Sequence, residues 1–170
     1  MVFGADREHL PPRRCGLPME PDVNMVKGGT MRVRVVYQST TGNTKKVAEA
    51  IARAAGCVAE PLRATAVREP VDVLFLGSSI HGGDIDASVK RFIKGLDPAL
   101  VRQVTVFSTG FEEHKEQAVS IMKDLLGRRG VVATDKCYAC RGRFLLFGWG
   151  HPGAADLTGA EEFARSILAR

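Results

Sequence analysis

A short polar loop between two hydrophobic segments holds the residues best suited to bind an anion. It joins a β-branched run, 31–38, to a segment, 44–55, whose apolar residues recur at helical spacing. Backbone N–H groups at a helix start, backed by the positive end of the helix dipole, attract anions, and hydroxyls add donors. The loop residues are Ser39, Thr40, Thr41, Gly42, Asn43 and Thr44. They predict a phosphate site; the alternative is an N-cap made by Ser, Thr or Asn without a ligand.

Several kinds of phosphate site are excluded by what this loop lacks. Neither the Walker pattern G-x-x-x-x-G-K-[ST] nor the dinucleotide pattern G-x-G-x-x-G follows the first hydrophobic run. A thiolate phosphatase needs a cysteine nucleophile in the loop, and none stands between Gln38 and Thr44. A receiver domain needs acidic residues where this chain has Tyr37 and Gln38. ATP, NAD and phosphotransfer by these routes are therefore not expected.

The loop belongs to a regular alternation of strands and helices. Buried strands are expected at 31–38, 57–61, 71–77, 103–108 and 131–137, and helices at 44–55, 87–95, 115–126 and 156–168. Parallel strands need crossovers, so the alternation predicts an α/β fold: a doubly wound five-stranded parallel sheet with helices on both faces. Ligands of such sheets bind at the carboxyl ends of the strands. The loops after the first, third and fourth strands are therefore the expected site.

Residues 35–51 resemble the flavodoxin signature. Two aliphatic residues and the aromatic Tyr37 precede an S/T-x-T-G-N-T loop, and Ala48 and Ile51 follow on the helix. The resemblance in strand order covers 31–170 and implies a flavodoxin-like sheet of order 2-1-3-4-5 that binds FMN, with the phosphate on residues 39–44. It also implies two loops around the isoalloxazine ring, namely Ser78, Ser79, Ile80, His81, Gly82 and Gly83 in the first and Ser108, Thr109, Gly110 and Phe111 in the second.

The two ring loops carry more detailed expectations. Gly82 or Gly83 is expected to let the peptide approach the ring and turn, because only glycine adopts a positive φ at little cost. Phe111 is expected to stack on the ring, with His81 or Ile80 covering the other face. The alternatives are that Phe111 packs on the helix below it and that His81 is an ordinary exposed loop residue.

The charge of the chain bears on its partners. The chain has 170 residues, a net charge of +5 and a pI near 9.2. Residues 1–30 hold equal numbers of acidic and basic residues, so the surplus falls on 31–170. Flavodoxins are typically acidic, so the resemblance together with a basic domain implies redox partner proteins that are either of a different kind or acidic. The basic residues are scattered without an aromatic-plus-basic module, so no nucleic acid is expected.

The remaining organisation follows from composition. Residues 1–30 are rich in proline and glycine and show no periodicity, so they are expected to form a flexible N-terminal tail before a flavodoxin-like FMN-binding domain at 31–170. No apolar run approaches the ~18 residues of a membrane span, and the first thirty residues lack the apolar core of a signal peptide. A cytoplasmic location is expected, and the oligomeric state is left open.

Cys137 and Cys140 form a C-x-x-C pair. One such pair is half of a zinc site, and no second pair or suitably spaced histidines accompany it, so no metal is expected. A redox-active dithiol is the alternative, although such pairs usually open a helix and this one follows an expected strand. The loop 138–152 contains an apolar run, 144–149, that is expected in the core, over the flavin or as an exposed patch.

Residues 77–92 also resemble the corresponding loop and helix of flavodoxin-like protoporphyrinogen and quinone-linked oxidases. The sequence therefore predicts an FMN-binding electron-transfer protein without a catalytic side chain. The alternative is an FMN-dependent oxidoreductase acting on a quinone or a protoporphyrinogen-like substrate. A third interpretation is a module that keeps the fold but has lost the flavin. The intact loop 39–44, which we call the phosphate loop, opposes it.

Overall fold

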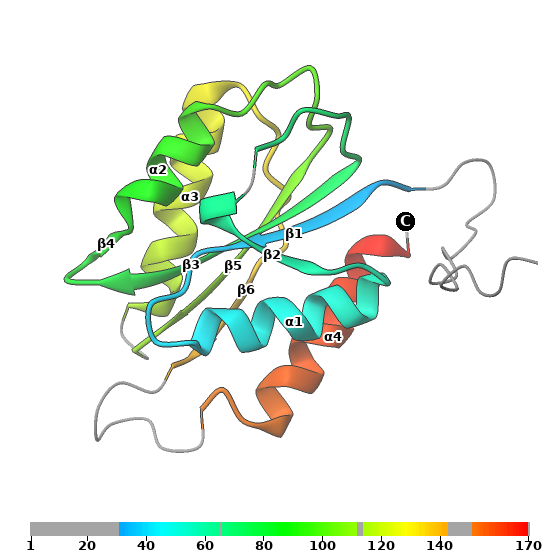
Figure 1. Cartoon of the computed structure of the whole chain (residues 1–170). Helices are drawn as coiled ribbons and strands as arrows, with labels where there is room; N and C mark the ends of the chain where they lie inside the picture. Colours follow the sequence, from blue (N-terminus) through cyan, green and yellow to red (C-terminus); the bar gives the residue numbers. More distant parts are fainter. Residues whose placement is uncertain (1–30, 65, 112–113, 143–150, 170) are drawn as a thin grey trace, which may run out of the picture.

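Most strands are followed by a helix, but the second strand is followed only by a short 3-10 turn and the third directly by the short fourth strand (Figure 1). The computed structural model describes residues 31–64, 66–111, 114–142 and 151–169. The tail expected at 1–30 and the apolar run at 144–149 lie outside these residues. The strands are β1 (Val33–Tyr37), β2 (Ala59–Pro61), β3 (Val73–His81), β4 (Asp84–Ile85), β5 (Val104–Gly110) and β6 (Tyr138–Arg141). The helices are α1 (Asn43–Ala55), α2 (Ala87–Lys94), α3 (Lys115–Arg129) and α4 (Ala154–Leu168), with a 3-10 turn, η1 (Leu62–Ala64), after β2.

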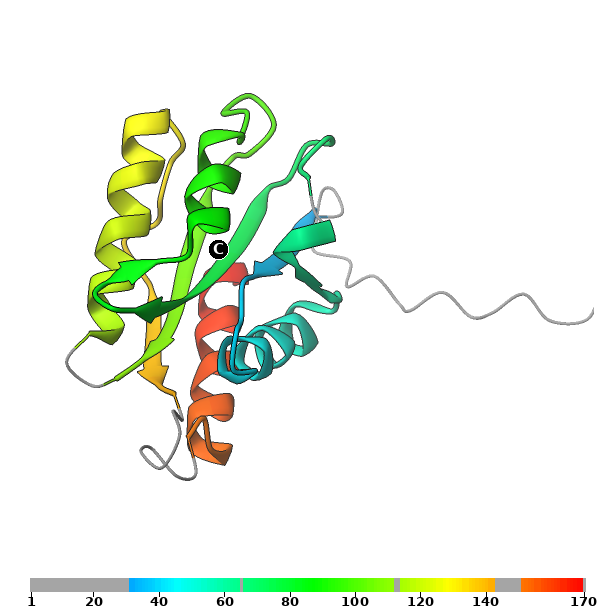
Figure 2. The ribbon, with the colours of Figure 1, turned by 60° about the vertical axis from the view of Figure 1, so that its left-hand side comes forward.

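The main sheet is parallel and has the order β2-β1-β3-β5-β6. This confirms the expected 2-1-3-4-5 order, because β4 is only a two-residue antiparallel strand paired with the end of β3. Helices α1 and α4 cover one face of the sheet, and α2 and α3 cover the other, as Figures 1 and 2 show. The fold is therefore the doubly wound α/β architecture that the sequence predicts.

Alternation along the strands divides the core into two layers. Successive strand side chains point to opposite faces, so Val35 and Phe75 pack under α1 and α4, while Val36 and Leu74 pack under α2 and α3. All four side chains are fully buried. Burying one such side chain contributes about 1.5–3 kcal/mol. The two layers fix the sheet from both sides, so its carboxyl edge is a rigid support for the loops that leave it.

The third strand is longer than its apolar run indicates. The sequence places residues 78–84 in a loop after Gly77, but β3 continues to His81. Ser78 pairs with Ser108 and Ser79 with Thr109 in the ladder with β5. Small hydroxyl residues fit this buried position because they can satisfy their own polar atoms, as the Ser78 Oγ does by donating to the Ser79 carbonyl at 2.9 Å.

The fifth strand lies further along the chain than expected. In the interval 131–137 only Ala133 makes a bridge to β5, and the regular ladder begins at Tyr138. The Thr134 N–H still donates to the Val104 carbonyl of β5 at 2.9 Å, but the Thr134 hydroxyl donates to the Lys136 carbonyl at 3.0 Å and Lys123 Nζ of α3 donates to the Asp135 carbonyl at 2.7 Å. Side chains thus bind the carbonyls of residues 135 and 136, where the ladder is interrupted. The expected strand at 131–137 is therefore wrong, and the first residues of the expected loop 138–152 form β6.

Among the described residues, none of the helices combines the length and the apolar character that a membrane crossing requires.

Candidate functional site

The carboxyl ends of β1, β3 and β5 meet around one small cavity, which we call the ring cavity. Its lining comes from the loop after β1, the end of β3, the end of β5 and the residue after β6. The lining residues are Thr41, Asn43, Ser79, Ile80, His81, Thr109, Gly110, Phe111 and Gly142. Thr41 and Gly142, 101 positions apart in the chain, are thus brought together at the edge where doubly wound sheets bind ligands.

The loop after β1 turns tightly into α1. Gly42 has φ 84°, a left-handed conformation that favours glycine, and its N–H donates to Ser39 Oγ at 3.1 Å. Gly42 is also the residue that precedes the helix, and it has no side chain to cap the first turn. The alternative of an ordinary cap by Ser, Thr or Asn is therefore wrong. Within the described residues, the residue before α1 thus supplies no side-chain cap, and helix starts of this kind attract anions.

Two side-chain hydrogen bonds hold this loop in place. Asn43 Nδ2 donates to Thr41 Oγ1 at 2.9 Å, and the hydroxyls of Thr44 and Thr109 lie 2.8 Å apart. Thr44 is fully buried, so this second bond joins the start of α1 to the end of β5 inside the protein. The loop and the β5 end are thereby fixed relative to each other.

The end of β3 turns back on itself as a hairpin. Gly82 and Gly83 both have positive φ, 58° and 81°, and β4 then pairs antiparallel with residues Ile80 and His81. Two consecutive positive φ values are typical of a tight primed turn and favour glycine at both positions. Gln117 of α3 donates to the Gly83 carbonyl at 3.0 Å, which anchors the turn to the helix layer.

A chain of hydrogen bonds connects this hairpin to Gln38, directly after β1, and to the cap of α2. Ser79 Oγ lies 3.1 Å from His81 Nε2 and donates to Gln38 Oε1 at 3.2 Å. Since the Ser79 hydrogen is directed to Gln38, His81 Nε2 acts as the donor toward Ser79. Gln38 Nε2 in turn donates to Asp86 Oδ2 at 3.4 Å. His81 is thus oriented by groups from β1, β3 and α2.

Asp86 caps helix α2. Its Oδ1 accepts from the Ser88 N–H at 2.7 Å and from the Ser88 hydroxyl at 2.5 Å. These bonds lower the pKa of Asp86, and the Ser88 hydroxyl has the largest effect, with Arg63 and His81 adding weaker attraction. The carboxylate therefore stays charged through the neutral range.

We expect Asp86→Ala to lower the free energy of unfolding by about 1 kcal/mol, because the cap of α2 is lost. Asp86→Asn keeps a capping oxygen and is the matched control. Because the pKa of Asp86 is lowered by folding, its charged contribution is complete above the unfolded pKa of about 3.9 and is lost as the pH falls through the lowered value. Urea denaturation at several pH values measures both effects. A stability difference between wild type and Asp86→Asn that does not shrink below about pH 4 would contradict this account.

The end of β5 presents an aromatic ring to the cavity. Phe111 follows Gly110 and keeps 44% of its surface exposed. Stacking on a ring and packing on the helix below both stay predictions for Phe111. Ile80 on the β3 side is buried and Phe111 is not, which gives the cavity one fixed apolar wall and one exposed wall.

The remaining expected site residues lie at different depths. Ser39, Thr40 and Gly42 line a second cavity on the β2 side of the loop. Ser78 and Ser108 are fully buried in β3 and β5. Thr44, Gly82 and Gly83 support the site from behind or from its rim without lining either cavity.

Sequence reasoning missed two residues that shape the site. Gln38 is the central member of the hydrogen-bond chain. Gly142 lies where a Cβ atom would be 2.9 Å from Asn43 Nδ2, so a larger residue would displace a side chain of the ring cavity. The glycine was visible in the sequence, but its contact across 99 residues was not.

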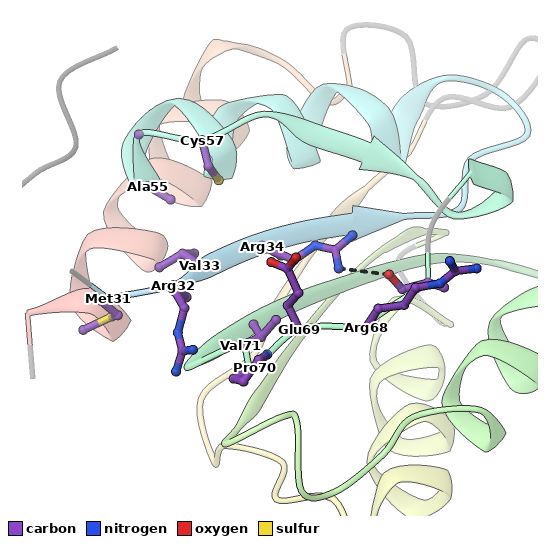
Figure 3. Close-up of a pocket in the computed structure, with 12 residues that line it drawn as sticks. Met31, Arg32, Val33, Arg34, Ala55, Cys57, Arg68, Glu69, Pro70 and Val71 are labelled. Carbon is purple, nitrogen blue, oxygen red and sulfur yellow. Dashed lines mark hydrogen bonds between the residues drawn. The ribbon is translucent and has the colours of Figure 1, made fainter. Parts of the chain in front are cut away.

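A further cavity of about 500 Å³ lies at the opposite, amino-terminal end of β1 (Figure 3). Two of its cations have acidic partners on the protein: Arg34 binds both carboxylate oxygens of Glu60, at 2.9 and 2.6 Å, and Arg32 pairs with Asp72 at 3.2 Å. This cavity lies at the amino-terminal end of β1, whereas the ring cavity lies at the carboxyl ends of the strands, so it is not part of the expected site. We call it the remote cavity.

The C-x-x-C pair does not have the geometry of a dithiol site. Tyr138 and Ala139, the residues between the two cysteines, are extended in β6, and strands rise about 3.3 Å per residue. The two Cα atoms are therefore about 10 Å apart, beyond the ~7 Å limit for a disulfide. Cys140 is buried and Cys137 is exposed. The dithiol alternative does not fit this strand.

We expect the cysteines to differ sharply in alkylation by iodoacetamide at pH 8. Exposed Cys137 should react readily, whereas burial, assisted by the nearby Glu60 charge, raises the pKa of Cys57 to about 11 and should slow its reaction. Peptide mapping by mass spectrometry gives the order of labelling. Recovery of a peptide with a Cys137–Cys140 disulfide after mild oxidation would contradict the extended geometry.

Known proteins show the same architecture. A family model described as the flavodoxin domain matches residues 34–145. An uncharacterized protein of Methanocaldococcus jannaschii is 29% identical over 149 residues, which cover 81% of this chain and 99% of the relative. Among solved structures, a flavodoxin from the domain Archaea superposes with a TM-score of 0.67 at 18% identity, covering 82% of this chain and 97% of the other. Flavodoxin 2 from Bacillus cereus gives a TM-score of 0.64 at 21% identity, covering 81% and 98%.

The structural likenesses show the fold, and the family model covers more than half of the chain, including the loop before α1 and the ends of β3 and β5. This chain therefore belongs to the flavodoxin domain family.

Proposed function

We propose that this chain binds FMN and acts as an electron-transfer protein of the flavodoxin type. The observation that carries the proposal is the meeting of the uncapped start of α1, the β3–β4 hairpin and the end of β5 at the ring cavity. Together they offer anion-binding amides and hydroxyls beside apolar side chains. A phosphorylated aromatic ring needs this combination.

The residues would divide the binding of FMN between them. The phosphate would lie on the first-turn amides of α1 and on the hydroxyls and amide of the phosphate loop, with Thr44 positioning the loop through Thr109. The ring would lie between the hairpin and Phe111, where His81 is already oriented by Ser79. When bound, FMN supplies one- and two-electron transfer, so the protein has to bind and orient the ring and needs no reacting side chain.

The purified protein should take up one equivalent of FMN. The test is its visible spectrum, followed by acid release and identification of the chromophore, and by titration of the flavin-free chain with FMN. Residues 31–170 alone should bind FMN as tightly as the full chain if the domain boundary at 31 holds. A chain that neither retains nor takes up flavin would overturn the proposal.

Turnover separates a carrier from an enzyme. With a steady supply of reductant, a carrier should reduce a protein acceptor and should show no saturable turnover with a quinone. In a separate assay that supplies an electron acceptor, it should show no saturable oxidation of protoporphyrinogen. Saturable turnover of either small molecule would replace the carrier by an FMN-dependent oxidoreductase.

We also propose that the redox partner docks through an acidic surface, because residues 31–170 carry the net charge of +5. Opposite charges speed encounter, and salt screens them. The rate of electron transfer to such a partner should therefore fall as ionic strength rises. A rate that rises with salt would indicate a basic partner.

A further inference from the structure

A second cavity of about 620 Å³ adjoins the phosphate loop, and we call it the side cavity. The ring cavity extends from the loop toward β3 and β5, whereas the side cavity extends toward β2, η1 and the start of α2. Ser39, Thr40 and Gly42 of the phosphate loop form part of its wall. Its volume is within the range of about 300–1,000 Å³ that is usual for small-molecule sites.

The charged side chains of the side cavity favour an anion. Lys45 and Arg63 are its two cations, and Asp86 is its one acidic lining residue. The Asp86 carboxylate is already engaged by Ser88 and Gln38 as the cap of α2. Lys45 has only a long, exposed contact of 3.8 Å with Glu49, and such exposed pairs contribute little. Lys45 is thus available to a ligand at modest cost, and Arg63 is exposed, with its described electrostatic attraction directed at Asp86.

One helix adds to this positive potential. The start of α1 at Gly42 borders the side cavity and has no acidic residue in its first turn, whereas the start of α2 is already occupied by the Asp86 carboxylate. Helix N-termini carry partial positive charge that acts within about the first turn. The cavity therefore combines two cations with one helix start.

The rest of the lining suits a flat, partly apolar group. Tyr37, Pro61 and Leu62 supply apolar surface, and Gln38, Ser39, Thr40 and Ser88 supply amide and hydroxyl groups. A ligand with a phosphate at one end and a heteroaromatic ring at the other would use both parts. A nucleotide has this chemistry.

We propose that the side cavity binds a phosphorylated nucleoside beside the flavin phosphate, with Arg63 and Lys45 facing its phosphate. Two molecules could bring this chemistry: FAD, whose ADP half would continue from the shared phosphate loop, and a separate nucleotide such as ADP. The proposal rests on the proposed function for the place of the first phosphate.

The experiment compares FMN, FAD and ADP as probes. Flavin-free protein is titrated with FMN and with FAD by flavin fluorescence, and FMN-loaded protein is titrated with ADP by calorimetry. Arg63→Ala should raise the dissociation constant for FAD or for ADP about three- to tenfold and that for FMN less than about twofold, since a charged hydrogen bond to phosphate is lost at a partly exposed site. Lys45→Ala should have a smaller effect in the same direction.

Two matched controls remove a positive charge elsewhere. Lys46 is the exposed neighbour of Lys45 on α1 and does not line the side cavity, and Arg68 lines the remote cavity. Lys46→Ala and Arg68→Ala should leave the affinities for FAD and ADP within about twofold. Equal losses in the controls would mean that net charge, and not the side cavity, determines binding.

The outcomes are distinct. Arg63-dependent FAD binding without ADP binding identifies the cofactor as the source of the nucleotide, and Arg63-dependent ADP binding to the FMN-loaded protein identifies a separate ligand. FMN binding with no Arg63-dependent affinity for FAD or ADP overturns the inference and leaves the proposed function intact. If no flavin binds, the proposed function fails, and ADP titration of the flavin-free chain and of Arg63→Ala then decides the inference alone.

Discussion

Thr41→Asp should weaken FMN binding by a factor of about 100 while leaving the fold at least as stable. Thr41 lines the ring cavity one residue before the turn into α1. A carboxylate there would face the phosphate, and repulsion of like charges at about 4 Å contributes roughly 1–4 kcal/mol near a protein surface, with tenfold in affinity for each 1.4 kcal/mol. The same carboxylate near a helix N-terminus stabilises the helix by about 0.3–1 kcal/mol. Lost binding with retained stability is the signature that distinguishes a phosphate site from a merely structural loop.

Thr41→Asn is the matched control, because it has the shape of aspartate without its charge. Its FMN affinity should lie close to that of the wild type and far above that of Thr41→Asp. Fluorescence titration gives the affinities, and urea denaturation of the flavin-free proteins gives the stabilities. An aspartate variant that binds FMN within threefold of the asparagine variant would show that the phosphate does not lie on this loop.

The second large effect is expected inside the sheet. A Cβ atom on Gly77 would lie 2.2, 2.3 and 2.9 Å from three ring atoms of Phe107, the residue opposite it on β5. Both residues belong to central strands, and the Phe107 ring is fully buried, so neither can move without disturbing the layer under α1 and α4. Forcing extra atoms into a packed core costs about 1–3 kcal/mol or more. Gly77→Ala should therefore lower the free energy of unfolding by about 3 kcal/mol, measured by urea denaturation.

Gly127→Ala provides the contrast. Gly127 is inside α3, and apart from its chain neighbours and the nearby backbone of the helix itself no described heavy atom lies within 4 Å of the position its Cβ would take. The same substitution there should raise stability by about 0.5–1 kcal/mol, since alanine favours the helix. Combining Gly77→Ala with Phe107→Leu should recover part of the loss, because two residues in contact do not act independently. A Gly77→Ala protein as stable as the wild type would refute the close approach of β3 and β5.

The sequence predicts the architecture well because hydrophobic spacing reflects which residues are buried. Val35 and Val36 point to opposite layers, as a strand buried on both faces requires, and the helix expected at 44–55 differs from α1 by one residue at its start. Patterning fails where polar residues enter a strand. Ser78 and Ser79 interrupt the apolar run, yet they continue β3 because β5 offers Ser108 and Thr109 opposite them.

The candidate site could be predicted only in part for the same reason. The phosphate loop is a contiguous motif, so its residues can be read from the chain. Gln38 and Gly142 gain their roles from partners on other elements, namely Ser79 and Asp86 for the first and Asn43 for the second. Arg63 has no motif at all and is brought to the loop by the order of β2 and β1. Such contacts depend on tertiary packing, which spacing does not encode.

The two outer strands of the described sheet bear on how readily another chain could pair with it. An outer strand offers unpaired backbone groups to another chain, and long, flat ones template aggregation. Here β2 has three residues and ends in Pro61, which has no N–H to donate, and β6 has four residues and is separated from the Ala133 bridge by an interruption that includes Lys136. Within the described residues, both edges therefore offer only short stretches of backbone for edge-to-edge pairing.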